Sequence, residues 1–150
     1  FAVSAAIVRG SRVMAVEGER VSAADLERNA RATDGAVTAV HASVESMFDE
    51  GDPKASGRAG ARSRSGAPWP IDRARATVVV DPPRTGMSKA ALDGVVSLRA
   101  PRVVYVSCDP ATLARDARRL VDAGYALANL QAFDLFPNTP HVETVTVFNR

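Results

Sequence analysis

The sequence has 150 residues, of which 46% are hydrophobic, and this fits one globular domain that is long enough to bury a core. It contains no apolar run of the roughly 18 to 20 residues that a membrane-spanning helix needs, and no charged segment precedes its apolar start, so we expect neither a membrane span nor a secretory signal. Its single cysteine excludes a disulfide framework and a cysteine-rich zinc site and suits a reducing cytoplasm, while a net charge of +2 permits a nucleic-acid partner without arguing for one.

The first third of the chain predicts alternating helices and strands. We expect a helix at residues 1–8, a buried strand at 12–16, a helix at 23–32 with Ser22 as its N-cap, a strand at 37–41 and a short helical turn at 44–48. Residues 50–75 are rich in Gly, Ser, Pro, Ala and Arg and lack hydrophobic periodicity, which predicts a long mobile loop. Its basic side chains would allow contact with RNA, but a solvated insertion without a role is the interpretation that we favour.

A more regular pattern returns after residue 75. We expect strands at residues 76–80, 102–107, 127–133 and 142–148, and helices at 88–97 and 111–123, with Ser88 as N-cap of the first helix and Asp109 near the start of the second. The β-branched run at 76–80 is typical of a strand buried on both faces. Alternating strands and helices predict an α/β fold with a mainly parallel sheet, and the last two strands, with no helix between them, predict an antiparallel hairpin at one edge.

Candidate functional residues follow the expected strands. Ligands of open α/β sheets bind beyond the carboxyl ends of the strands. Such ends carry Glu17, Ser43, Asp81 and Cys108. A carboxylate in the place of Glu17 can accept hydrogen bonds from both ribose hydroxyls of a nucleoside, although a surface carboxylate in a loop explains it equally well.

Two of these positions have a more specific local context. Two prolines follow Asp81 and fix a stiff, extended exit from its strand, which can hold the carboxylate at a defined point in a cleft; a plain strand terminator is the alternative. Cys108 stands between a strand and a helix, where the dipole and free N–H groups of a helix N-terminus stabilise a thiolate nucleophile, although most lone cysteines are buried apolar side chains. The neighbouring Asp109 fits an N-cap as well as a catalytic group.

His141 and Glu143 follow a turn-rich segment at residues 136–140. A carboxylate at this place can act as a general base. A structural hydrogen bond is the simpler role for the histidine.

Three segments carry a family resemblance: VVVDPPRTG at residues 78–86, VVYVSCDPATLARD at 103–116 and DLFPNTPHVETVTVF at 134–148. Their order and spacing resemble the bacterial RNA (uracil-5-)-methyltransferase family, which contains the enzymes for tRNA and 23S rRNA. A fourth segment, VMAVEGERVSAADLERNAR at 13–31, resembles the family's second S-adenosylmethionine (SAM) motif more loosely. The resemblance implies a class I SAM-dependent methyltransferase fold with a Rossmann-like sheet, of which residues 1–150 are a partial catalytic domain.

The resemblance also implies a covalent mechanism on a uridine of RNA. Cys108 would attack C6 of the ring, C5 would take the methyl group of SAM, and Glu143 would remove the C5 proton so that elimination releases the cysteine. The remaining implied roles are SAM binding for Glu17 (ribose), Ser43 (adenine) and Asp81 (methionine end or base), and contact with RNA phosphate or the carboxylates of the site for Arg84.

Two departures from the family pattern matter. Ser43 stands where family members commonly carry an acidic or amide residue. The family's first SAM motif and its upstream RNA-binding domain do not occur in this sequence, so we expect a gap or an exposed edge between the strands at 12–16 and 76–80. We therefore expect this chain to be a fragment, truncated at its N-terminus, that binds SAM poorly by itself.

The main alternative is an inactive domain that only binds RNA or a partner, and SAM binding discriminates between the two. An amino-directed methyltransferase shares the Asp-Pro-Pro start of its motif, but Arg84 replaces the aromatic residue and Cys108 would have no role. An RNA m5C methyltransferase typically uses two cysteines, and this chain has one.

Overall fold

The computed structural model describes residues 1–48, 71–139 and 142–150. The chain divides into two compact units, Phe1–Ile71 and Asp72–Arg150. Each unit contains one sheet, of two and of four strands respectively, and we call them the smaller-sheet unit and the larger-sheet unit.

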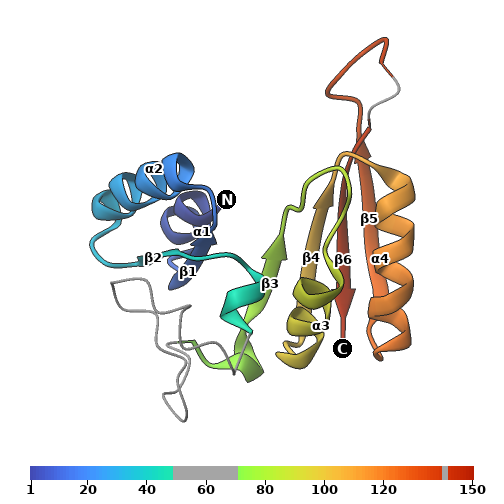
Figure 1. Cartoon of the computed structure of the whole chain (residues 1–150), viewed down its shortest axis with the longest axis horizontal. Helices are drawn as coiled ribbons and strands as arrows, with labels where there is room; N and C mark the ends of the chain where they lie inside the picture. The colour runs from blue at the N-terminus through green and yellow to red at the C-terminus, as the bar shows by residue number, and fades with distance from the viewer. Residues whose placement is uncertain (49–70, 140–141) are drawn as a thin grey trace. The chain divides into compact units, whose positions relative to one another are not determined.

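Four main elements build the smaller-sheet unit. They are α1 (Ala2–Arg9), β1 (Val13–Glu17), α2 (Arg20–Ala30) and β2 (Val37–His41), with one-turn 3-10 helices at Arg31–Thr33 and Glu45–Met47. β1 and β2 are parallel, with Val13 opposite Val37 and Glu17 opposite His41. Figure 1 shows α1 and α2 beside β1 and β2. Both helices contribute an alanine to the core, where Ala6 and Ala30 pack with Val37.

The sequence predicted these elements to within a few residues, but it placed the start of α2 wrongly. Ser22 is not the N-cap. Glu19 has extended backbone angles, and its carboxylate accepts a 2.8 Å hydrogen bond from the Ser22 N–H. An ionised carboxylate is a stronger acceptor than a hydroxyl, so the helix begins earlier, at Arg20.

The larger-sheet unit contains the remaining main elements. They are β3 (Thr77–Val80), α3 (Lys89–Ser97), β4 (Arg102–Ser107), α4 (Pro110–Asp122), β5 (Ala126–Phe133) and β6 (Glu143–Asn149). The strand order is β3-β4-β6-β5. β3 and β4 are parallel, whereas β6 lies between β4 and β5 and is antiparallel to both. Figure 1 shows β6 pointing against β3 and β4.

The predicted antiparallel hairpin and the N-cap of α3 at Ser88 are confirmed. The prediction of a mainly parallel sheet was wrong for this unit, because insertion of β6 between its neighbours makes two of the three strand pairings antiparallel. The prediction that the strand at 76–80 is buried on both faces was also wrong. β3 is an edge strand, and Val79 is 48% exposed. β1 and β3 belong to separate sheets of two and four strands.

Large side chains fill the core of this unit. Tyr105 and Phe148 from the sheet and Leu92 and Leu120 from the helices are almost completely buried. α4 covers the face of the sheet that bears Tyr105, since the tyrosine hydroxyl donates a 2.7 Å hydrogen bond to Asp116 of that helix. An ion pair between Arg119 and Asp93 joins α4 to α3.

The long loop expected at residues 50–75 falls mostly outside the described residues. Its last part is described and is not a loop throughout. Arg73–Arg75 forms one turn of 3-10 helix, because the Asp72 carboxylate accepts a 3.0 Å hydrogen bond from the Ala74 N–H and caps it.

Candidate functional site

Asp81 and Cys108 lie at the same edge of the larger sheet. β3 and β4 are parallel with Val80 opposite Tyr105, and Asp81 and Cys108 are the first residues after these strands. Asp81 is exposed and Cys108 is half-buried. The placement agrees with the expectation that the carboxyl ends of neighbouring parallel strands share one edge.

Glu143 begins β6 at this edge. The last residue of β4, Ser107, is paired with Thr144 of β6. The Thr144 hydroxyl donates a 3.1 Å hydrogen bond to the Ser107 carbonyl and closes the ladder there. Cys108 and Glu143 each lie one residue from this pair, and both are half-buried. The tertiary structure thus brings together the predicted nucleophile and the predicted base, which are 35 positions apart (143 minus 108) in the sequence.

The backbone on both sides of Cys108 is held by Ser107. Its buried hydroxyl accepts a 3.1 Å hydrogen bond from the Asp109 N–H and donates a 2.9 Å hydrogen bond to the Asp109 carbonyl. The same residue is tied to β6 through its own carbonyl. Cys108 therefore sits in a tight turn that is fixed on one side by the sheet and on the other by the start of α4.

Asp109 is the N-cap of α4, which decides between its two candidate roles in favour of the cap. Its carboxylate accepts a 2.8 Å hydrogen bond from the Thr112 N–H. This bond is the main cause that lowers the pKa of Asp109, and the nearby positive charge of Arg84 lowers it further.

Arg84 belongs to a tight turn directly after β3. The Gly86 N–H donates a 2.8 Å hydrogen bond to the Pro83 carbonyl, and Gly86 has a φ of 73°, a left-handed angle that glycine adopts without strain. Arg84 itself is exposed. Asp81, Arg84, Cys108 and Glu143 are therefore all residues of one sheet edge or of the loops that leave it.

The smaller-sheet unit holds the other two predicted residues at an equivalent edge. β1 and β2 end side by side, and Glu17 is paired with His41. Gly18 packs closely against the backbone of Ser43, since a Cβ atom at Gly18 would lie 3.5 Å from the Ser43 Cα. The Glu17 carboxylate is half-buried and accepts a 2.9 Å hydrogen bond from the Glu19 N–H. Ser43 is exposed, and its hydroxyl accepts a 3.1 Å hydrogen bond from the Ser46 N–H.

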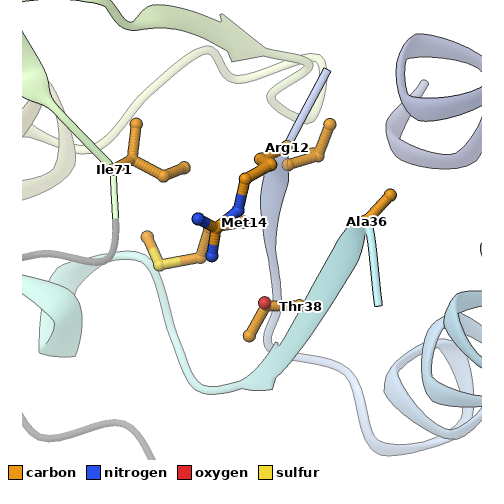
Figure 2. A pocket seen from close by; sticks show the side chains of 6 residues that line it. Arg12, Met14, Ala36, Thr38 and Ile71 are labelled. Atoms are coloured by element: carbon orange, nitrogen blue, oxygen red, sulfur yellow. The ribbon is translucent and has the colours of Figure 1, made fainter. Parts of the chain in front are cut away.

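A small pocket of the smaller-sheet unit lies at the opposite end of these strands. Figure 2 shows Arg12, Met14, Ala36, Thr38 and Ile71 around it. Its volume is about 10 Å³, which is roughly the room of one water molecule. Both its size and its place at the starts of β1 and β2 exclude it as the site of a nucleoside.

Several residues that shape the site were not predicted. Ser107 and Thr144 are buried polar residues at the strand ends, and Asp116 is a buried carboxylate of α4. The sequence carried a signal for Asp116, because it lies between Leu113 and Leu120 at the spacing of the buried face of a helix. A charged residue on such a stripe requires a partner.

Among the residues that the structure describes, no group of three or more His, Cys, Asp or Glu residues could hold a metal ion. No helix in the described part of the chain is sufficiently long and apolar to cross a membrane. His141 lies outside the described residues.

Comparison with known proteins gives concordant matches. A relative from Bifidobacterium longum, named as an uncharacterized RNA methyltransferase, is 38% identical over 93% of this chain and 28% of its own length. A Bacillus cereus relative of the same description is 50% identical over 49% of this chain and 16% of its own length. The structure of Pyrococcus abyssi tRNA (uracil-54, C5)-methyltransferase in complex with S-adenosyl-L-homocysteine is 26% identical, with a TM-score of 0.67, and the match covers 94% of this chain and 29% of that one.

The structural match confirms the expected Rossmann-like methyltransferase fold. The chain spans less than a third of the length of each of these relatives. A family model described as tRNA (Uracil-5-)-methyltransferase matches residues 71–150, which is more than half of the chain and includes the edge with Asp81, Cys108 and Glu143. This chain belongs to the tRNA (uracil-5-)-methyltransferase family.

Proposed function

We propose that the protein carrying this chain transfers a methyl group from SAM to C5 of a uridine in RNA, with Cys108 as nucleophile and Glu143 as base. The observation that carries the proposal is the pairing of Ser107 with Thr144, because it sets a half-buried thiol and a half-buried carboxylate one residue away from the same pair. The family match and the tRNA substrate named for the Pyrococcus abyssi structure support RNA as the substrate class.

The chemistry follows from the poor nucleophilicity of C5 in uracil. The Cys108 thiolate adds to C6, which forms an S–C6 bond and moves the ring electrons to C5 and O4 as an enolate. Bound SAM would supply an electrophilic methyl group, which C5 accepts as the S–CH3 bond breaks and S-adenosyl-L-homocysteine is left. Once C5 is methylated, the Glu143 carboxylate accepts the C5 proton, and the electron pair of that C–H bond restores the C5–C6 double bond while the S–C6 bond breaks. The thiolate is regenerated, so the cycle needs no oxidant and no metal.

The residues at the edge of the smaller sheet fit a nucleoside cofactor. Glu17 is a half-buried carboxylate at the carboxyl end of a parallel strand, next to the N-terminus of α2, which suits hydrogen bonds from ribose hydroxyls. Gly18 brings the backbone of Ser43 close to this strand end. We assign Glu17 and Ser43 to the adenosine part of SAM and Asp81 to its methionine end or to the base. Arg84 would contact the RNA phosphate.

Trapping with RNA that contains 5-fluorouridine tests the nucleophile. Fluorine at C5 cannot leave as a proton, so the adduct with Cys108 persists after methyl transfer and is seen as a mass increase of the protein. We expect an adduct in a form of the protein extended at its N-terminus, and none in C108A or with unmodified RNA. An adduct that survives in C108A, or its absence when SAM is bound, would contradict the proposal.

The same experiment tests the 150-residue chain by itself. β1 and β3 lie in separate sheets, and we expect the SAM affinity of this chain to be much lower than that of the extended form. Calorimetric titration with SAM measures the difference. An adduct formed by the 150 residues alone would contradict this expectation, whereas SAM binding and RNA binding without any adduct in either form would favour a domain that only binds RNA.

A further inference from the structure

The loop after β3 is attached to α4 by a buried carboxylate. Asp116 is 1% exposed, and its Oδ2 atom accepts hydrogen bonds from the Tyr105 hydroxyl at 2.7 Å and from the Met87 N–H at 2.8 Å. Its Oδ1 atom accepts a 2.8 Å hydrogen bond from Nε of Arg115. Removal of a carboxylate from water is costly unless donors replace the water. Three donors replace the water around Asp116. One of them, the Met87 N–H, belongs to the loop and is 29 residues away in the sequence.

Arg115 attaches the same loop from the solvent side. One of its guanidinium nitrogens, Nη2, donates to the Thr85 carbonyl at 3.0 Å and to the Met87 carbonyl at 3.3 Å, and it pairs with Asp116 at 2.7 Å. The Arg115 side chain is 53% exposed. In the described structure, the hydrogen bonds from Arg115 to the loop are to backbone carbonyls. These contacts therefore fix the backbone conformation of the loop.

Gly86 shows how closely the loop lies on the helix. A Cβ atom at this position would lie 2.5 Å from Nη2 of Arg115 and 2.7 Å from Oδ2 of Asp116. Its φ of 73° would also strain any other residue. Glycine thus lets the backbone approach both charged groups at hydrogen-bonding distance.

The helix that holds this loop begins two residues after Cys108. α4 starts at Pro110, with Asp109 as its N-cap. Arg84 lies in the attached loop, one residue before Thr85, and Gly86 of the same loop approaches the first turn of α4, since a Cβ atom there would lie 3.3 Å from the Cβ of Thr112. The contacts therefore connect the loop that carries Arg84 to the same helix that fixes the turn at the proposed nucleophile.

We infer that Arg115 and Asp116 are positioning residues, which fix the loop of residues 82–87 on α4 and so hold Arg84 beside the turn that contains Cys108. The inference rests on the proposed function for its consequence in catalysis. The attachment itself rests on the contacts of Asp116, Arg115 and Gly86.

Arg115→Ala is the sharpest test, because the half-exposed side chain can be removed without a cavity in the core. Arg118→Ala is the matched control: Arg118 lies on the same helix, is 78% exposed and pairs only within the helix with Asp122 in the described structure. Amide hydrogen exchange of the full-length protein reports on the loop without reference to activity. We expect faster exchange at Gly86 and Met87 in Arg115→Ala and wild-type exchange in Arg118→Ala.

A double-mutant cycle with Arg84→Ala then tests the consequence for the reaction. We expect Arg115→Ala and Arg84→Ala each to lower kcat/KM for RNA methylation about tenfold. Both variants should change the same one of the two parameters, kcat or KM. The double variant should have a kcat/KM no lower than that of Arg84→Ala alone. A general loss of folding would instead multiply the two effects. Arg115→Lys should recover part of the loss, because an ammonium group reaches one carbonyl but lacks the planar fork.

The outcomes separate the inference from the function on which it rests. Unchanged exchange at residues 85–87 in Arg115→Ala, or effects that multiply in the double variant, would overturn the inference. If the wild-type protein methylates no RNA, the proposed function fails, while the exchange experiment still decides whether Arg115 holds the loop. Asp116→Asn, which keeps the shape and removes the charge, should increase exchange at Met87 even more.

Discussion

The two units of the chain have very different cores. The larger-sheet unit buries Tyr105, Phe148, Leu92 and Leu120 almost completely. The core of the smaller-sheet unit is a cluster of Ala6, Ala30 and Val37, and every residue of β1 remains half-exposed. Large side chains remove far more apolar surface from water than alanines do. The edge with Cys108 and Glu143 is therefore backed by a core of large buried side chains, whereas the edge with Glu17 is backed by a smaller, mainly alanine core.

The largest expected difference concerns the two strand-end glutamates. Glu143→Gln should lower the methylation rate by about 10²- to 10⁴-fold, because the C5 proton has no acceptor. The variant should also accumulate a covalent adduct with methylated RNA when the substrate contains ordinary uridine. Mass spectrometry detects this adduct at the summed mass of protein and RNA. Glu17→Gln should instead raise the Kd for SAM by roughly tenfold or more, since a hydrogen bond to a charged group is lost.

If the two glutamate variants have the same effect, the different roles assigned to Glu143 and Glu17 are contradicted. Wild-type turnover in Glu143→Gln would remove the base assignment. A rate loss in Glu17→Gln that saturating SAM does not reverse would place this residue in the chemical step and contradict its assignment to the cofactor.

Core truncations compare the stability of the units. Phe148→Ala should lower the free energy of unfolding by about 3 to 5 kcal/mol, as expected for a fully buried aromatic side chain. Val37→Ala should cost about 2 kcal/mol or less, because it removes less volume from a smaller cluster. Urea unfolding with hydrogen exchange measures both effects. Equal losses would show that the alanine cluster is supported by packing beyond Ala6, Ala30 and Val37.

Two serines provide a smaller comparison. Ser107→Ala removes two hydrogen bonds within the turn at Cys108 and should cost about 1 to 2 kcal/mol of stability. It should also slow adduct formation more than it weakens RNA binding. Ser43→Ala removes a hydrogen bond from the Ser46 N–H on an exposed turn, and we expect a loss of stability within about 0.5 kcal/mol. Thermal unfolding and the trapping rate distinguish them, and a normal trapping rate in Ser107→Ala would show that the turn is held without this hydroxyl.

The smallest expected effect is on the pH dependence of the two helix caps. Hydrogen bonds from backbone N–H groups lower the pKa of Asp109 in one unit and of Glu19 in the other below their ordinary values of 3.8 and 4.5. A lowered pKa in the folded state contributes stability above the ordinary value, which is lost as the pH falls through the lowered one. Asp109→Asn and Glu19→Gln should each lower Tm by a few degrees at most at pH 7, and the difference from wild type should shrink below about pH 4. A constant difference down to pH 2 would contradict this.

Much of the architecture followed from local patterns. The strand at 37–41 and the strand at 102–107 were predicted with their observed bounds, and Ser88 was recognised as a cap, because β-branched runs and capping side chains act over a few residues. Cys108 and Glu143 were candidates from their places after a strand and after a turn, and the family resemblance supplied their roles as nucleophile and base. Their roles remain predictions that the trapping experiment tests.

The position of these residues relative to one another was decided only by the tertiary structure. The register of β4 and β6 brings Cys108 and Glu143 to one edge, and Asp116 joins helix α4 to the loop at Met87, 29 residues away in the sequence. Hydrophobic periodicity predicts which face of an element is buried. It does not predict which strand pairs with which, or which donors bind a buried carboxylate. The sequence alone thus determined the elements and the candidate chemistry, while long-range pairing determined which candidates share a site.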